Sequence, residues 1–187
     1  MHAWKQTARA LRHRAMCAIA AMCVAGVAYG KPPDPSVTVK FTGTYNSTTC
    51  TVADDDQNKR VDLPTISTAA LTTAGETRGE TPFTLSVRCD SDVGKLIAYF
   101  QRGPTTNANG NLDVENPDDP TSAKGVQIQL TNGDRTPIKI GDALTMQPVA
   151  VSASTPTPIP FIARYYATGN TSPGKVNTYV TFVLQML

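Results

Sequence analysis

The chain ends with the residues Val176-Asn177-Thr178-Tyr179-Val180-Thr181-Phe182-Val183-Leu184-Gln185-Met186-Leu187. In an extended strand, successive side chains point to opposite sides, so every second residue shares a face. One face here carries Val176, Thr178, Val180, Phe182, Leu184 and Met186. This face is mostly apolar, a pattern that predicts a half-buried β-strand.

The same period of two recurs along the chain, with its apolar residues in segments 37–41, 83–87, 96–100, 126–130 and 176–184. Turn-forming residues separate these segments, at 54–58, 103–110, 116–120, 132–134 and 156–160. No long segment holds a helical period, and residues 67–74 could form at most one helical turn. We therefore expect an all-β sandwich with long loops, in which residues 103–125 form a solvated surface loop.

Residues 1–30 have the features of a secretory signal. Lys5, Arg9, Arg12 and Arg14 precede a small, apolar run that is too short for a membrane-spanning helix. Cleavage is expected after Gly30, and a cut after Ala28 fits almost as well. The remaining residues suit one exported domain.

Removing this signal excludes several classes of function. Both histidines, the single tryptophan and four of the 17 basic residues lie within it, which leaves 13 basic and 15 acidic residues, a formal charge of −2. No nucleic-acid footprint remains, and neither a histidine-dependent nucleophile nor a histidine-containing zinc site can be built. We expect no enzyme activity, cofactor or metal.

Two acidic clusters are better explained as turns than as sites. The carboxylates at 113, 115, 118 and 119 could in principle form a hydrolytic pair, but prolines and Asn116 surround them in an exposed loop. The run Asp54-Asp55-Asp56 lacks the spaced oxygens of a calcium loop.

Cys50 and Cys89 are the only cysteines outside the signal. An isolated pair in an exported chain favours a disulfide, and two buried free thiols are the alternative. An antibody-type domain would place a tryptophan between more widely spaced cysteines, so a true immunoglobulin domain is not expected.

The C-terminal pattern resembles the signature of chaperone/usher pilins. Gly174 is fourteenth from the end, where that family carries a recurrent glycine ahead of an alternating last strand. The usual penultimate tyrosine is Met186 in this chain, a departure from the pattern.

Residues 37–45 resemble the N-terminal extension of the same family, which precedes the first cysteine. Its apolar face and glycine are Val37, Val39, Phe41, Gly43 and Tyr45. The segments Val61-Asp62-Leu63-Pro64-Thr65-Ile66 and Gly103-Pro104-Thr105-Thr106 are most similar to serotype-specific fimbrial subunits of the pertussis group. The resemblance covers nearly the whole chain after the signal.

This resemblance implies an immunoglobulin-like sandwich that lacks its final strand. Residues 31–46 would be the donor extension and residues 47–187 the pilin domain. In the family, a periplasmic chaperone strand fills the resulting groove first, and the next subunit's extension replaces it at the outer-membrane usher. The acceptor strand would comprise Gly174, Val176, Thr178, Val180, Phe182, Leu184 and Met186.

The implied function is that of a structural subunit in an adhesive fimbria on the bacterial surface. Its partners would be copies of itself, the chaperone, the usher and a possible tip adhesin, while the host receptor stays unknown. Residues 37–45 could instead be an ordinary first strand of a complete sandwich. A second hypothesis is a secreted or tip adhesin that binds a host glycan through its loops.

Overall fold

Seven strands and three short helical turns make up the part of the chain that the structure describes, which is residues 49–153 and 155–187 of a computed structural model. In chain order the elements are β1 (Cys50–Val52), α1 (Asp54–Gln57), η1 (Thr68–Ala70), β2 (Thr77–Cys89), β3 (Gly94–Phe100), β4 (Lys124–Asn132), η2 (Ala143–Thr145), β5 (Val149–Val151), β6 (Thr157–Ser172) and β7 (Phe182–Met186). None of the described helices could cross a membrane.

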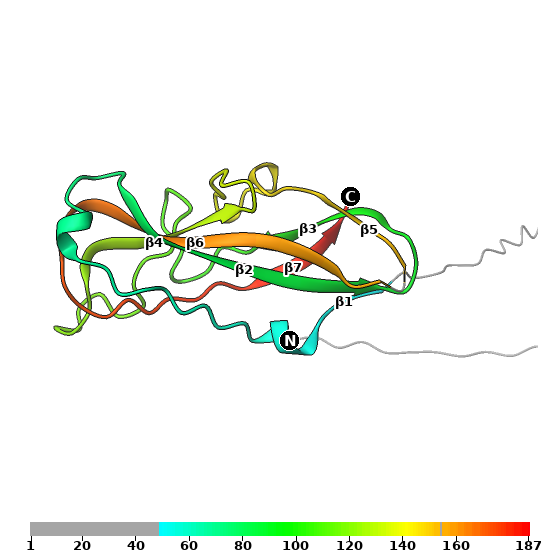
Figure 1. Cartoon of the computed structure of the whole chain (residues 1–187), viewed down its shortest axis with the longest axis horizontal. Coiled ribbons are helices and arrows are strands. Elements are labelled where there is room, and N and C mark those ends of the chain that lie inside the picture. Colours follow the sequence, from blue (N-terminus) through cyan, green and yellow to red (C-terminus); the bar gives the residue numbers. More distant parts are fainter. Residues whose placement is uncertain (1–48, 154) are drawn as a thin grey trace, which may run out of the picture. The chain divides into compact units, whose positions relative to one another are not determined.

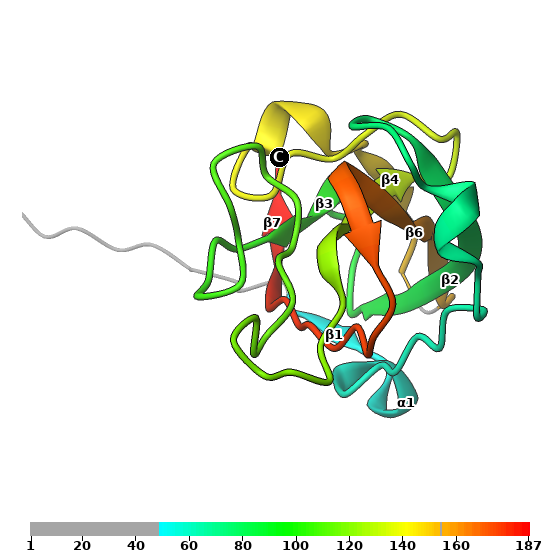
Figure 2. The same cartoon turned by 90° about the vertical axis from the view of Figure 1, so that its left-hand side faces the viewer.

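The strands form two antiparallel sheets. One has the order β1-β2-β6-β4 and the other the order β5-β3-β7 (Figure 1). In the end-on view of Figure 2, β2 and β6 lie on one side of the barrel-like section and β3 and β7 on the other. The expected all-β sandwich is therefore confirmed.

The core lies between the inner faces of the two sheets. Leu85 and Val87 of β2 are at most 1% exposed, as is Leu96 of β3. Phe100 of β3 meets Phe161 of β6 edge to face, with ring centroids 5.1 Å apart. The period-two pattern of these strands arises because one side of each faces this core.

The register of β6 shifts once against β2 and once against β4, and each irregular stretch contains a glycine with a positive φ. Gly79 (φ 70°) lies in the irregularity between β2 and β6, and Gly125 (φ 68°) lies in that between β4 and β6. Other residues seldom adopt this backbone conformation.

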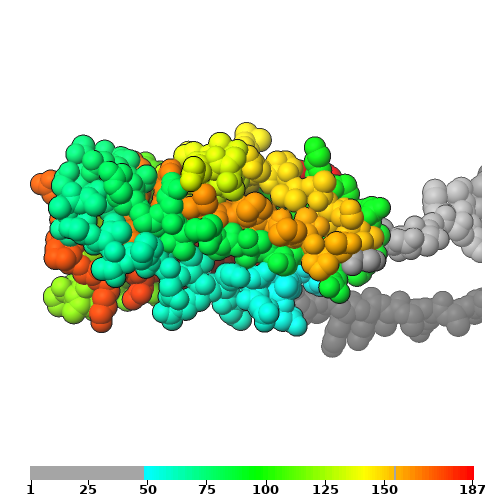
Figure 3. All heavy atoms as spheres, in the orientation of Figure 1, coloured from blue at the N-terminus to red at the C-terminus, as the bar shows by residue number. Residues whose placement is uncertain are grey.

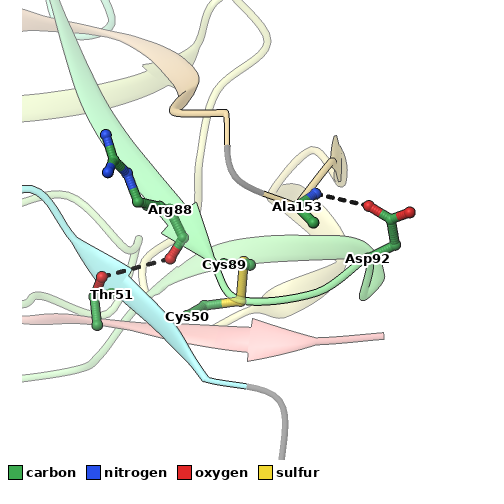
Figure 4. The surroundings of a disulfide bond; sticks show 6 residues. All are labelled: Cys50, Thr51, Arg88, Cys89, Asp92 and Ala153. Atoms are coloured by element: carbon green, nitrogen blue, oxygen red, sulfur yellow. Dashed lines mark hydrogen bonds between the residues drawn. A yellow bond between two sulfur atoms is a disulfide. The ribbon is translucent and has the colours of Figure 1, made fainter.

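Cys50 and Cys89 form the expected disulfide, which joins the start of β1 to the end of β2 (Figure 4). The two residues are direct partners in the β1–β2 register. Close by, the Ala153 backbone N–H donates to Asp92 Oδ1 at 2.7 Å, which ties the chain before β6 to the turn before β3. We call this region the disulfide end.

The prediction of a turn at 156–160 was wrong, because β6 begins at Thr157 and includes Pro158 and Pro160. These prolines pair with β2, but β4 reaches β6 only from Phe161 onward. Their missing N–H groups therefore cost no ladder bond on that open edge.

Residues 103–125 are only partly the solvated loop that we expected. Leu112 is 3% exposed and exchanges two 2.8 Å backbone hydrogen bonds with Ile128 of β4. Residues 116–120 are exposed, in keeping with the turn predicted there.

The expected helical turn in 67–74 is the three-residue η1. The predicted signal and extension, residues 1–46, lie outside the described residues.

Candidate functional site

A groove of about 990 Å³ runs along one side of the sandwich. One wall is residues 57–63, which comprise the last residue of α1 and the segment after it, and the other is the C-terminal segment, residues 176–183. These segments lie along the lower side of the molecule in Figure 3, coloured cyan and orange-red. The floor consists of side chains from both sheets and the 103–125 loop: Phe83, Leu85, Phe100, Leu112, Ile128, Leu130, Ala163 and Tyr165.

Among the described residues, the hydrogen bonds that hold the C-terminal wall are made along one of its two edges. Backbone oxygens of Asn177 and Thr181 accept hydrogen bonds from the N–H groups of Glu115 and Gln101, both at 2.8 Å. The Tyr179 oxygen accepts from Thr105 Oγ1 at 2.7 Å. All three of these acceptors are odd-numbered residues.

Backbone polar groups of adjacent residues in an extended segment point to opposite edges. The even-numbered residues 176–182 therefore direct their N–H and C=O groups toward the groove. On this same side of the chain, the edge of β7 is also unpaired: β7 is the edge strand of its sheet and pairs with β3 alone among the described strands. The groove thus offers a backbone edge to which another strand can add.

Gly174 marks the point where this wall begins. A Cβ atom built on it would lie 2.3 Å from the Ala123 backbone nitrogen and 2.4 Å from the Ser122 carbonyl carbon. Lys175 follows and exchanges backbone hydrogen bonds with Thr121 and Ala123, at 2.8 and 3.0 Å. Only glycine allows the two backbones to approach this closely. This close approach is the physical reason for a glycine at position 174.

The opposite wall is anchored by a buried carboxylate. Asp56 is 5% exposed, and its two oxygens accept hydrogen bonds from Lys59 Nζ and from the Ser86 backbone N–H of β2, both at 2.7 Å. The hydrogen bond from Lys59 lowers the pKa of Asp56, and the Ser86 N–H lowers it further against the opposing effect of burial. Asp56 thus fixes the start of residues 57–63, which include Lys59 itself, onto the sheet.

The floor is apolar. Near its middle, Ala163 is 3% exposed and offers little bulk between its neighbours Thr81 and Leu130 in the sheet. Toward the disulfide end, Phe100 and Phe182 approach each other with ring centroids 6.1 Å apart. At the far end stands Tyr165, whose pKa is raised by burial.

Thr178 belongs to the C-terminal wall of the groove. Its Oγ1 is buried. Among the buried side-chain nitrogen and oxygen atoms of the described residues, it is the one that has no hydrogen-bond partner. An unpaired buried hydroxyl costs free energy, on the order of 1–3 kcal/mol.

The predicted acceptor residues fall into two groups. Val176, Thr178, Val180 and Phe182 line the groove, preceded by Gly174. Leu184 and Met186 do not line it. Leu184 packs against the core opposite Ala98, whereas Met186 is 52% exposed opposite Leu96. The predicted donor residues Val37, Val39, Phe41, Gly43 and Tyr45 lie outside the described residues.

Sequence reasoning missed most of the groove beyond its C-terminal wall. Lys59, Val61 and Leu63 form the other wall although they belong to no strand. The alternation of Val61 and Leu63 was the available signal for this wall. Leu112 and Tyr165 gave no comparable signal, because their position depends on tertiary packing.

The chain is similar throughout to fimbrial proteins. The family model described as "Fimbrial protein" matches residues 39–186. The chain is 32% identical over 183 residues to the type-1 fimbrial protein, A chain, of Salmonella typhi, covering 94% of this chain and 99% of that protein. It is 30% identical over 173 residues to the serotype 2 fimbrial subunit of Bordetella pertussis, with 78% and 84% covered.

Two solved structures share the fold at low identity. The P pilus rod subunit PapA aligns with a TM-score of 0.57 and 13% identity, over 74% of this chain and 99% of PapA. A type I fimbria protein of Burkholderia pseudomallei aligns with a TM-score of 0.52 and 20% identity, over 74% and 98%. The expected pilin sandwich is therefore the observed one.

Proposed function

Because the chain belongs to the fimbrial protein family, we propose that copies of this structural pilin subunit join into an adhesive surface fimbria by donor-strand exchange. The observation that supports this mechanism is the groove beside the outer edge of β7. Residues 37–45 of the next copy would lie in it as an added strand. The side chains of the even-numbered residues between 37 and 45 would face solvent.

The dimensions of donor and groove agree. Nine residues in an extended strand span about 30 Å, and the eight residues of the wall from Val176 to Val183 span about 26 Å. The donor has an apolar face, Val37, Val39, Phe41, Gly43 and Tyr45, and the floor beneath it is apolar. Main-chain ladder bonds would hold the strand while these side chains bury.

Before assembly, the same groove would bind a strand of a periplasmic chaperone, which delivers the subunit to an outer-membrane usher. An unpaired strand edge beside exposed apolar groups promotes aggregation, so a subunit in transit needs a cover. Val183, Met186 and Leu187 of the C-terminal segment are 41%, 52% and 64% exposed.

Deletion of residues 31–46 tests the mechanism. The shortened subunit should still bind its chaperone, because its groove is intact, but it should not enter a fibre. Polymers are read as a ladder in denaturing gels of unboiled protein. Deletion of residues 31–36 alone is the matched control and should leave the ladder unchanged, because the donor face remains.

Polymers formed by the 31–46 deletion would refute donor-strand exchange. A clean monomer band from the full mature subunit would instead support the alternative of a secreted binding module.

A further inference from the structure

The first four residues of β6 form an edge that no described strand covers. β4 pairs with β6 only from Phe161 onward, and its last residue, Asn132, is the partner of Phe161. Gly133 begins the turn that follows and packs against Pro160, because a Cβ atom built on Gly133 would lie 2.7 Å from Pro160 Cγ. We call residues 156–160, on the side that faces away from β2, the β6 edge.

The backbone groups of Pro158 point toward this edge. Its partner in the β2–β6 register is Ser86. The Ser86 N–H donates to Asp56 Oδ2 at 2.7 Å, and the Ser86 oxygen accepts from the Ala53 N–H at 2.8 Å, so both groups point away from β6. In an antiparallel pair, opposite residues that exchange hydrogen bonds alternate with opposite residues that do not. Pro158 therefore directs its backbone nitrogen and oxygen away from β2.

The same alternation applies two residues before and two residues after Pro158. Residues 156 and 160 direct their backbone groups toward the β6 edge, while Thr157 and Ile159 direct theirs toward β2. All three edge positions, 156, 158 and 160, are prolines, which have no N–H group. Residues 156–160 thus present carbonyl oxygens at the β6 edge but no hydrogen-bond donor.

The groove side of the C-terminal segment has the opposite composition. The residues that direct their backbone groups toward the groove are Val176, Thr178, Val180 and Phe182, and each of them has an N–H group. A strand that adds to an edge needs donors as well as acceptors there, because its own carbonyl groups lose their water when it docks. An added strand finds both kinds of group at the groove, whereas its carbonyl groups would stay unpaired at the β6 edge.

We propose that Pro156, Pro158 and Pro160 exclude strands of other copies from the β6 edge, which confines strand addition between copies to the groove. Natural sheets use proline at an edge to prevent edge-to-edge pairing. The edge strands β1 and β5 are protected differently, because each has only three residues. The exclusion prevents copies from pairing sheet to sheet, and its role in keeping a fibre unbranched rests on the proposed function.

Restoring donors to the β6 edge tests the proposal in the full mature subunit. P156T with P158T changes two exposed residues and returns two N–H groups to each copy. The concentration at which native subunits associate, followed by light scattering, should fall at least about tenfold, because each restored hydrogen bond contributes about threefold to tenfold. Hydrogen exchange at the new amide of position 158 should slow as association proceeds. The ladder in denaturing gels of unboiled protein should not change.

P117T with P120T is the matched control, because it makes the same two replacements in an exposed turn outside the described strands and should match wild type. P158T alone restores one donor, should give a smaller shift, and keeps the test decisive if the double variant unfolds. Wild-type association of P158T and of the double variant, or tighter association with fast exchange at position 158, would overturn the proposal. Absence of a ladder from wild type would instead refute the proposed function and leave the edge measurement unaffected.

Discussion

At the scale of single residues, Asp56 and Gly174 hold the two walls of the groove by different physical means. Asp56 uses a buried carboxylate to bind a backbone N–H of β2 and the ammonium group of Lys59. Gly174 acts through the absence of a side chain, which lets the C-terminal wall pass against the backbone of Ser122 and Ala123. Neither role involves chemistry on a substrate.

Asp56 should make stability sensitive to acid. Its pKa is lower in the folded chain than the value of about 3.9 for an unfolded aspartate, so its stabilisation is complete above that pH and is lost as the pH falls through the folded pKa. Asp56→Asn should cost about 1–3 kcal/mol at pH 7. It should also reduce the loss of unfolding free energy between pH 7 and pH 3, measured by urea titration.

The exposed neighbour Asp55 provides the control for that measurement. Asp55→Asn should retain both the stability at pH 7 and the acid-induced loss. Equal pH dependence in the two variants would show that Asp56 does not anchor the wall.

Gly174→Ala should destabilise the subunit by about 1–3 kcal/mol, because the added methyl group meets backbone atoms that cannot rotate away. Gly103→Ala is the matched control, since a Cβ there meets no atom within 4 Å. Thermal unfolding of the two variants gives the comparison. Equal melting temperatures would contradict the close approach described for Gly174.

At the scale of elements, the disulfide fastens the short strand β1 to the far longer β2. β1 has three residues, too few to hold its place by ladder bonds alone, and it leads into the wall that Asp56 anchors. The bond closes a loop between residues 39 positions apart, which is worth about 4 kcal/mol in the loop-entropy model.

Replacing both cysteines with serine should therefore lower the free energy of unfolding by about 4 kcal/mol and reduce the amount of folded subunit recovered from cells. The double replacement avoids leaving a lone buried thiol at Cys89. An unchanged yield of folded subunit and an unchanged urea midpoint would show that β1 is held by other contacts.

Much of the element structure was predictable from alternation, and the exceptions have physical causes. Segments 83–87, 96–100 and 126–130 are all strand, because one apolar face of each meets the core. β6 was missed because Pro158 and Pro160 resemble a turn unless the unpaired edge beside them is known. Only the second half of the predicted C-terminal strand has a strand partner, as its first half borders the groove.

At the scale of the whole molecule, the groove combines segments that are far apart in the chain. Its walls come from residues 57–63 and 176–183, and its floor includes Leu112 from a loop expected to be solvated. Alternation reports which side of a strand is apolar but not which strands meet. The C-terminal wall could therefore be predicted by resemblance, whereas the opposite wall and the floor required the fold.

The occupant of the groove in assembled fibres is the observation on which the account depends. A fibre structure at side-chain resolution should show residues 37–45 of a neighbouring copy lying in the groove as a strand beside the outer edge of β7. A groove closed by the chain's own residues within the fibre, or by no donor strand at all, would contradict the account.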